Sequence, residues 1–344
     1  MSSNEVARTP FTKYNKTIQD GDIVIAYVNP LDMQAIKIVK DGSLNNKYGA
    51  FHHNNIIGKP FGTRIVSQKG NGHMTFLHPT PELWTQTLPH RTQILYMPDI
   101  ALISSLLDLK PGAIVVESGT GSGSFSHSIA RTIAPSGTLH TFEYHEERVL
   151  KFKDELKLHA LTDIVKVQHR NVCKDGFGLE NVADAVFLDL PSPWEAIASA
   201  KQSFKKGKVG RICTFSPAIE QVQRTCEELG KLGFYDVRMY ETLIRKQEVK
   251  TLTKRPLPTR ENASGFIKKD APKRKREGDE VEEGEEAKKE KLEDGVDGET
   301  TAAVGGDVDV KVDDKSDQVV VTRPVTNVAG HTSFLVFASI LIDE

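Results

Sequence analysis

Two different periods of hydrophobic residues divide this chain. Between Thr17 and Met74, short stretches rich in β-branched residues are separated by Asp-Gly and Asn-Gly dipeptides. The clearest stretches are Asp22 to Val28 and Ala35 to Val39. Stretches of this kind between turn dipeptides are typical of β-strands. We therefore expect a small N-terminal β-domain, a barrel-like or sandwich-like fold, over residues 1–78.

The pattern changes after a proline-containing connector at His78 to Arg91 and a helical period over Gln93 to Leu109. Apolar runs then alternate with helical segments such as His145 to His159 and Ala218 to Leu232. This alternation predicts an α/β fold with a mostly parallel sheet that is covered on both faces. The expected strands are Ala113 to Glu117, Thr138 to Glu143, Ile164 to Gln168, Ala183 to Leu188, Gly210 to Phe215, Tyr235 to Leu243 and Ser333 to Leu341.

A charged segment interrupts this pattern before the last strand. No aromatic residue occurs between Ile267 and Ser333, and Lys268 to Asp294 has 20 charged residues in 27. Such a composition buries too little apolar surface to offset the loss of chain entropy on folding. We expect a main α/β domain over 79–250, a disordered insertion over 251–322 and the last strand of the sheet within 323–344.

The net charge of −2 conceals a strong asymmetry. Residues 277–314 hold 16 acidic and 4 basic residues, so the rest of the chain carries a net charge of +10. A basic body is compatible with a polyanionic partner. The cluster Lys273 to Arg276 is either a nuclear import signal or a solvated charge run, and we favour the import signal and a nuclear location.

Several classes of protein are disfavoured. No run of 18 apolar residues occurs and the first ten residues are polar, so we expect neither a membrane span nor a secretory signal. The 3 cysteines are widely spaced, which argues against a disulfide framework. The 11 histidines show no metal-binding spacing, and we predict no metal site.

The candidate chemistry begins at the glycine-rich stretch after the first expected strand of the α/β region. Glu117 precedes three alternating glycines, Gly119, Gly121 and Gly123. Alternating glycines let the backbone turn sharply and approach a ligand closely. A dinucleotide-binding motif would need its third glycine at position 124, which is serine. The pattern instead resembles the first motif of class I S-adenosylmethionine (SAM) methyltransferases, although it is also compatible with an ordinary strand-to-helix turn.

Two further strand ends carry polar residues. Glu143 ends the next strand 20 residues after Gly123, where a carboxylate can bind ribose hydroxyls. Asn171 and Val172 follow the third strand, where they would meet the edge of an adenine ring. A solvated carboxylate at a strand end is the alternative interpretation for Glu143.

The fourth strand runs into the string Asp189-Leu190-Pro191-Ser192-Pro193-Trp194. Ligands of open α/β sheets bind beyond the carboxyl ends of the strands, so Asp189 and Gly119 should face one cleft. The string resembles the motif by which methyltransferases hold an amino-substituted base, with Trp194 offering a face for stacking. A proline-rich loop before a helix that begins near Glu195 is the alternative.

The chain is identified as a member of the tRNA (adenine-58-N1)-methyltransferase family and resembles its eukaryotic catalytic subunits. The resemblance covers Phe61 to Leu243 and the final strand. The strings that carry it are Gly62 to Val66, His78 to Thr85, Leu88 to Tyr96, Glu117 to Ser124, Ala183 to Ala196, Cys213 to Cys226 and Gly330 to Thr332.

The resemblance implies a class I SAM-methyltransferase fold, Rossmann-like, with a seven-stranded sheet whose last strand is antiparallel. It also implies that SAM is the cofactor and that Asp189 is catalytic. The family usually has Asp at the position of Asn171, so hydrogen bonding to the cofactor adenine is altered here. The residues implied to bind SAM are Leu95 from the connector helix, Glu117, Gly119, Gly121, Ser122, Gly123, Ser124, Glu143, Arg148, Asn171, Val172 and Asp189.

The implied reaction is an in-line attack of adenine N1 in the tRNA T-loop on the activated methyl group. Asp189 would accept a hydrogen bond from the exocyclic amino group and favour the positive charge that develops on the base. Extrusion of the nucleotide from the folded tRNA is expected.

The resemblance further implies a homologous non-catalytic partner subunit that helps to hold tRNA, in a heterotetramer of two pairs. Two alternatives remain open. One is a SAM methyltransferase that acts on another substrate, and the other is a non-catalytic tRNA-binding subunit with a degenerate fold.

Overall fold

The computed structural model describes residues 11, 14–244, 247–253, 318–324 and 333–343. Residues 1–244 and 329–344 form one compact unit, and residues 245–328 form a second. The Lys273 to Arg276 cluster and most of the expected disordered insertion lie outside the described residues.

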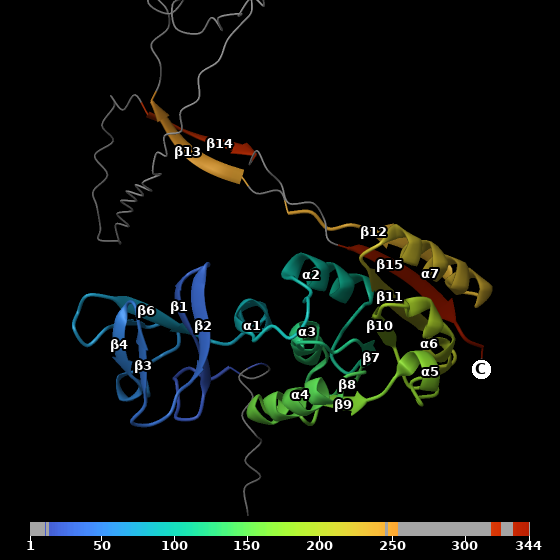
Figure 1. The fold of residues 1–344 in the computed structure, drawn as a ribbon, viewed down its shortest axis with the longest axis horizontal. Helices are drawn as coiled ribbons and strands as arrows, with labels where there is room; N and C mark the ends of the chain where they lie inside the picture. The colour runs from blue at the N-terminus through green and yellow to red at the C-terminus, as the bar shows by residue number, and fades with distance from the viewer. Residues whose placement is uncertain (1–10, 12–13, 245–246, 254–317, 325–332, 344) are drawn as a thin grey trace, which may run out of the picture. The chain divides into compact units, whose positions relative to one another are not determined.

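The N-terminal part of the first unit is an antiparallel sheet, as the short β-rich stretches predicted (Figure 1). Its strand order is β2-β1-β6-β5, which is an open sheet rather than a closed barrel. Between β2 and β5 in the chain, the strands β3 and β4 form a separate hairpin. Phe76 of this sheet and Phe51 of the hairpin are fully buried in one core cluster, with ring centroids 6.3 Å apart. The strands are β1 (Ile23–Asn29), β2 (Asp32–Lys37), β3 (Ser43–Asn46), β4 (Gly49–His52), β5 (Arg64–Val66) and β6 (His73–Leu77).

A seven-stranded sheet of order β12-β15-β11-β10-β7-β8-β9 forms the rest of this unit. Neighbouring strands are parallel, except that β15 lies antiparallel between β11 and β12. The prediction of a mostly parallel sheet with an antiparallel last strand is thus confirmed. The strands are β7 (Ile114–Ser118), β8 (Thr138–Glu143), β9 (Val165–His169), β10 (Ala185–Asp189), β11 (Val209–Ser216), β12 (Tyr235–Tyr240) and β15 (Phe334–Leu341).

Helices cover both faces of this sheet (Figure 1). Side chains of successive strand residues point to opposite faces, so Val115 packs in one core cluster and Val116 in the other. The first cluster contains residues of α1 to α4 and the second contains residues of α5 to α7. The helices are α1 (Pro81–Thr87), α2 (Met97–Leu106), α3 (Ser124–Ile133), α4 (Glu146–Leu158), α5 (Val172–Asp175), α6 (Ile197–Ser203) and α7 (Ile219–Lys231).

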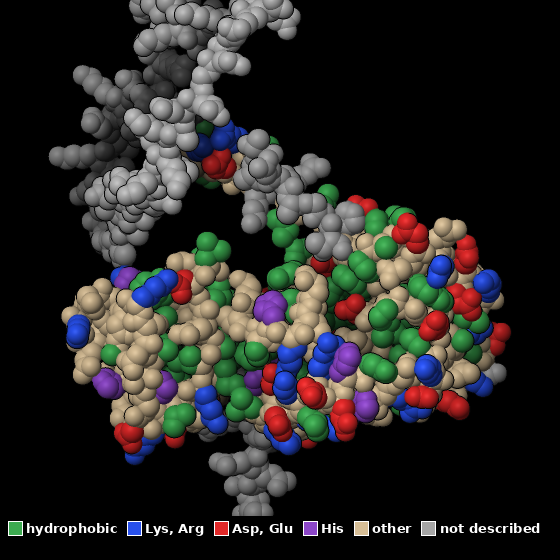
Figure 2. Space-filling view, viewed as in Figure 1, with side chains coloured by type: hydrophobic (Ala, Val, Ile, Leu, Met, Phe, Trp, Pro, Cys, Tyr) green, Lys and Arg blue, Asp and Glu red, His purple; other side chains and the backbone are tan. Residues whose placement is uncertain are grey.

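The amphipathic helix α4 shows how the spacing of apolar residues determines which face of a helix packs on the sheet. Val149, Phe152 and Leu156 are buried at helical spacing. The remaining positions are mostly charged, and Figure 2 shows acidic and basic side chains interspersed over the surface of this helix. One face therefore packs on the sheet while the other is solvated.

Two differences from the sequence prediction lie in the connector. α1 was not predicted, because seven residues give too short a hydrophobic period; it is defined by Pro81 at its start and by the Thr80 side chain, which accepts a hydrogen bond from Leu83 N at 3.4 Å. The next helix begins at Met97 instead of Gln93, with Pro98 in its first turn. Leu95 therefore lies in a non-helical segment, whose polar groups bond elsewhere, as described below.

The second unit contains a two-stranded ladder of β13 (Gln247–Thr253) and β14 (Gln318–Pro324). The two strands pair antiparallel in continuous register, and Arg323 Nε lies 2.9 Å from a carboxylate oxygen of Glu248. Strand residues thus occupy both ends of the range 251–322 in which we expected disorder. β-Branched residues at Val249, Val320 and Val321 favour this extended pairing.

Candidate functional site

The glycine turn lies between β7 and α3, at the carboxyl ends of the parallel strands. Gly119, Gly121 and Gly123 all have positive φ, at 93°, 55° and 77°. Residues with a Cβ rarely adopt this conformation. The three alternating glycines are therefore required by the backbone path itself.

Each glycine also touches a different structural element. A Cβ on Gly119 would lie 2.1 Å from the carbonyl oxygen of Asp189 at the end of β10. A Cβ on Gly121 would lie 2.7 Å from the hydroxyl of Thr92, and one on Gly123 would lie 2.3 Å from the Phe152 ring. The turn is thus wedged between β10, the connector and α4.

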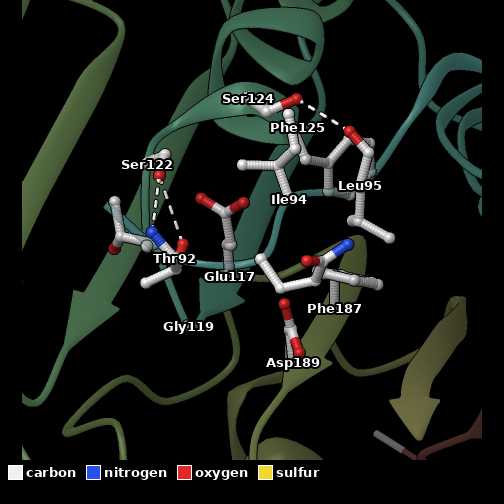
Figure 3. A pocket seen from close by; sticks show the side chains of 13 residues that line it. Thr92, Ile94, Leu95, Glu117, Gly119, Ser122, Ser124, Phe125, Phe187 and Asp189 are labelled. Carbon is white, nitrogen blue, oxygen red and sulfur yellow. Dashed lines mark hydrogen bonds between the residues drawn. The ribbon is translucent and has the colours of Figure 1, made fainter. Parts of the chain in front are cut away.

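Two serines of the turn bind the connector (Figure 3). The Ser122 hydroxyl accepts hydrogen bonds from the backbone N–H groups of Arg91 and Thr92, at 2.8 and 3.1 Å. The Ser124 hydroxyl donates to the carbonyl of Leu95 at 3.0 Å. The helix does not extend back to Gln93, because inside a helix Pro98 would lack an N–H donor and its ring would clash with the carbonyl of Ile94. Leu95 nevertheless lies at the site, where it lines a small pocket with Glu117 and Asp189.

Glu143 lies at the end of β8, where its spacing predicted it, and its side chain faces the glycine turn. One carboxylate oxygen accepts from Gly121 N at 2.9 Å. The other accepts from His145 N at 3.0 Å and lies 3.5 Å from the guanidinium of Arg148. A carboxylate has about four acceptor positions, so Glu143 retains capacity for ribose hydroxyls.

Asn171 and Val172 follow β9 on the opposite side of the same cavity. Asn171 precedes the first residue of α5, and its carbonyl accepts hydrogen bonds from Lys174 N and Asp175 N. Val172 is 3% exposed and packs in the second core cluster. The short helix α5 thereby fixes this wall of the cavity.

Asp189 ends β10 beside the turn, and burial raises its pKa to about 7, with a further increase from the charge of Glu143. Glu117 is 1% exposed and accepts a hydrogen bond from the Ser126 hydroxyl at 2.6 Å. Burial likewise raises the pKa of Glu117 to about 7, opposed by hydrogen bonds and assisted by the charges of Asp189 and Glu143. Figure 3 shows the Glu117 and Asp189 carboxyl groups in the same pocket.

Gly119, Glu143, Asn171 and Asp189 line a cavity of about 460 Å³, a size typical of sites for drug-sized ligands, and Glu117 lines the small pocket that shares Asp189 with it. Crowded carboxylates with raised pKa values are stabilised by a cationic ligand, because its charge offsets their repulsion. The cavity therefore fits a cationic ligand with hydroxyl groups. Its lining comprises Thr92, Gln93, Ser118, Gly119, Gly121, Glu143, Tyr144, His145, Arg148, Arg170, Asn171, Val172, Cys173, Asp189, Leu190, Pro191, Ser192 and Glu195.

The structure thus brings the expected site residues together around the turn. Leu95, Glu117, Ser122 and Ser124 line the small pocket, whereas Gly123 lines neither the pocket nor the cavity. Thr92, Gln93 and Arg170 lie in loops and also line the cavity, and the sequence did not indicate them as site residues. Only the position of Arg170 directly before Asn171 could have suggested it.

Trp194 does not line the cavity. Its indole packs against the second core cluster, and the Arg224 guanidinium lies 5.2 Å from the ring centroid. The expectation that Trp194 offers a stacking face to a base is therefore not supported by its position. Pro191 and Ser192 occupy the cavity wall instead.

No group of three or more His, Cys, Asp or Glu side chains among the described residues is arranged to hold a metal ion. Among the helices that the structure describes, none combines the length and the apolar character needed to cross a membrane.

A family model described as "tRNA methyltransferase complex GCD14 subunit" matches residues 72–340. The chain is 45% identical over 239 residues to the tRNA (adenine(58)-N(1))-methyltransferase catalytic subunit of Candida albicans, covering 69% of this chain and 71% of that protein. It is 38% identical to the corresponding subunit of Yarrowia lipolytica, covering 96% of this chain and 88% of that protein.

A solved structure supports the fold assignment. The structure of the tRNA (m1A58) methyltransferase from Aquifex aeolicus matches with a TM-score of 0.60 and 21% identity. The match covers 94% of this chain and 98% of that chain. The class I SAM-methyltransferase fold that the family resemblance implied is confirmed.

Proposed function

The chain belongs to the family described as the tRNA methyltransferase complex GCD14 subunit, and we propose that it is a catalytic subunit that transfers the methyl group of SAM to N1 of adenine 58 in tRNA. The observation that carries this proposal is the contact of the Asp189 carbonyl with Gly119. It joins the expected base-binding strand end to the cofactor turn in one cavity.

The residues present fit SAM, whose sulfonium and ammonium groups are cationic. We assign its binding to Leu95, to the turn from Gly119 to Ser124, to Glu143 and Arg148, and to Asn171 and Val172. Glu117 and Asp189 supply negative charge at the deep end of the site. Asn171 accepts and donates hydrogen bonds through its amide, so it can bond to the cofactor adenine without the charge usual in the family.

Bound SAM would supply an activated methyl group, which adenine N1 attacks in line. The work of the protein is then positioning and electrostatics. Asp189 as a carboxylate accepts a hydrogen bond from the exocyclic amino group of the base and stabilises the positive charge that develops on the ring. Its location at the end of a central strand holds the carboxylate rigidly, since β7 and β11 flank β10.

The test is mass spectrometry of nucleosides after incubation of the co-expressed complex with SAM and an unmodified tRNA transcript, with the modified position mapped. We expect 1-methyladenosine at position 58. A transcript with guanosine at that position is the matched control and should remain unmodified. Methylation elsewhere in the tRNA, or of protein alone, would refute the substrate assignment.

Two alternatives are weaker. A non-catalytic subunit should have lost the glycine turn or the base-binding aspartate, and this chain has both, with Gly119 and Asp189 in contact. A methyltransferase for another substrate is disfavoured by the identity to relatives named for tRNA methylation.

We also propose that the chain assembles with a homologous non-catalytic subunit as two pairs that bind tRNA together. The family description names a subunit of a complex, which supports the presence of a partner. Native mass spectrometry of the co-expressed proteins should give the mass of two pairs. Equal tRNA affinity of the chain alone and of the complex would contradict the need for a partner.

We make two further proposals, one on the limits of the domains and one on the location of the protein in the cell. We propose an N-terminal β-domain over 1–78, a methyltransferase domain over 79–250 completed by 323–344, and a charged insertion over 251–322. We propose a nuclear location that depends on Lys273 to Arg276. Replacing these four residues with alanine in a fluorescent fusion should shift it to the cytoplasm, and unchanged nuclear fluorescence would contradict this.

A further inference from the structure

The back of the glycine turn, on the side of α4, carries two buried polar pairs that the proposed reaction does not use. One is the pair of histidines His127 and His159, both fully buried. The other is the ion pair of Arg91 and Glu155, whose side chains are 12% and 17% exposed. Both pairs connect the turn to the last turn of α4.

The histidine pair holds the carbonyl of Gly123. His127 Nδ1 lies 2.6 Å from this oxygen, which also accepts the helical N–H of His127 at 3.2 Å. His127 Nε2 lies 2.8 Å from His159 Nδ1. Burial lowers the pKa of His127 to about 4 and that of His159 to about 2, so both rings are neutral at neutral pH.

This neutrality fixes the direction of the hydrogen bonds. The Gly123 carbonyl can only accept, so His127 carries its proton on Nδ1 and has a free acceptor at Nε2. His159 must then donate from its own Nδ1. The chain of donors runs in one direction, from His159 to His127 and from His127 to the turn.

The ion pair holds the preceding carbonyl. Arg91 Nη2 donates to the carbonyl of Ser122 at 3.2 Å and lies 2.7 Å from a carboxylate oxygen of Glu155. Two successive carbonyls of the turn are thus held by two separate side-chain relays. These carbonyls belong to the two peptide groups between Ser122 and Ser124, and both serines line the small pocket that Leu95, Glu117 and Asp189 also line. Holding the carbonyls therefore fixes the backbone at that pocket.

Both relays originate on one face of α4. Phe152, Glu155 and His159 recur at the helical spacing that places side chains on one face. Phe152 packs against Gly123, Glu155 binds Arg91, and His159 bonds to His127. The Phe11 ring packs against both histidines. Its centroid lies 4.9 Å from the centroid of the His127 ring and 4.5 Å from that of the His159 ring.

We propose that the end of α4 sets the shape of the glycine turn through these two relays, and that His127 is a positioning residue for SAM that acts through the Gly123 carbonyl. This inference rests on the proposed function only in its choice of cofactor. The turn binds the cofactor before and during methyl transfer alike, so its distortion should raise KM and Kd for SAM while kcat changes little.

The test compares two variants of the full chain by calorimetric titration with SAM. His127→Asn keeps an N–H donor near the position of Nδ1 but is smaller than histidine, whereas His127→Leu fills the volume and lacks the donor. A positioning role predicts that His127→Leu weakens SAM binding about tenfold, the upper range for loss of one hydrogen bond, and that His127→Asn largely restores it. A packing role predicts the reverse order.

Control variants make the outcome decisive. His140→Leu changes a histidine on β8 that is only partly buried, and should leave the Kd for SAM unchanged. Circular dichroism of each variant checks the fold. If His127→Leu binds SAM as the unmodified chain does, or more tightly than His127→Asn, the inference is wrong. If the unmodified chain binds no SAM, the assignment of the cofactor itself fails.

A double-mutant cycle tests the relay. His159→Leu should weaken SAM binding in the unmodified chain but have no further effect in the His127→Leu background, because the bond to Gly123 is already lost. Additive effects of the two substitutions would contradict a relay through His127.

Discussion

The carbonyl oxygen of Asp189 occupies the space that a side chain on Gly119 would need, 2.1 Å from the position of its Cβ. The strand end that carries the base-binding carboxylate and the turn that binds the cofactor are therefore in direct backbone contact. A substitution that pushes the strand end and the turn apart should therefore alter base binding and cofactor binding together.

Replacing Gly119 by alanine should abolish function for this reason. The positive φ of 93° adds strain to the clash with Asp189. We expect SAM affinity to fall by about a hundredfold, which corresponds to about 3 kcal/mol. Gly230→Ala in α7 is the matched control, because its Cβ would meet nothing within 4 Å and alanine favours helix. Normal SAM binding by Gly119→Ala, measured by calorimetry, would contradict the geometry.

Asp189→Asn keeps the shape of the side chain and removes its charge. We expect kcat/KM for tRNA methylation to fall by about a hundredfold or more, with a smaller change in the Kd for SAM. The exposed Asp163→Asn should be indistinguishable from the unmodified chain. A methylation rate of Asp189→Asn within threefold of normal would exclude Asp189 from the chemistry.

The raised pKa of Asp189 also predicts a pH profile. The carboxylate is the active form, so kcat/KM measured at low SAM should rise with pH and level off above about 7. A bound cation favours the carboxylate, so the rise in kcat at saturating SAM should lie at lower pH. An unchanged midpoint between the two conditions would show that another group controls the profile.

Glu117→Gln should alter how stability depends on pH. The folded-state pKa of about 7 exceeds the ordinary value of 4.5, so the folded chain retains a proton that the unfolded chain loses between these values. The contribution of Glu117 to stability is therefore present below pH 4.5 and is lost as pH rises through 7, by up to about 3 kcal/mol. In urea denaturation without SAM, the variant should lose less stability between pH 5 and pH 8. Parallel curves for the two proteins would refute the burial of an ionisable Glu117.

Trp194→Ala distinguishes packing from base stacking. The indole packs on the core and against Arg224, so its removal should lower the free energy of unfolding by about 2 kcal/mol. The KM for tRNA should change by less than about twofold at a temperature where the variant remains folded, because Trp194 does not line the cavity. A large increase in this KM would restore the stacking role that the sequence suggested.

The sequence predicted most of the fold because its signals are local. The alternation of Val115 and Val116 between two cores and the period of Val149, Phe152 and Leu156 follow directly from strand and helix geometry. The positions of Gly119, Glu143 and Asp189 at strand ends follow from the same rule, since ligands bind beyond the carboxyl ends of parallel strands.

The features that the sequence did not predict depend on contacts between residues that are far apart in the chain. The carbonyl of the non-helical Leu95 accepts a hydrogen bond from Ser124, 29 positions away. Arg91 and Glu155 are 64 positions apart, and nothing local in either segment indicates their pairing. The strands β13 and β14 are separated in the sequence by the whole charged segment, and their pairing is not visible in its composition. Composition alone therefore predicted disorder at both ends of that segment, where these strands lie.

The placement of β15 has a consequence for how the chain is made. β15 follows β12 in the chain but inserts between β11 and β12, and in the part of the chain that the structure describes β12 pairs with no other strand. During synthesis the backbone N–H and C=O groups of β12 have no strand partner until the residues of β15 have been made. Its nascent form is therefore a predicted client for chaperones, and stalled translation in the charged segment should yield aggregating fragments.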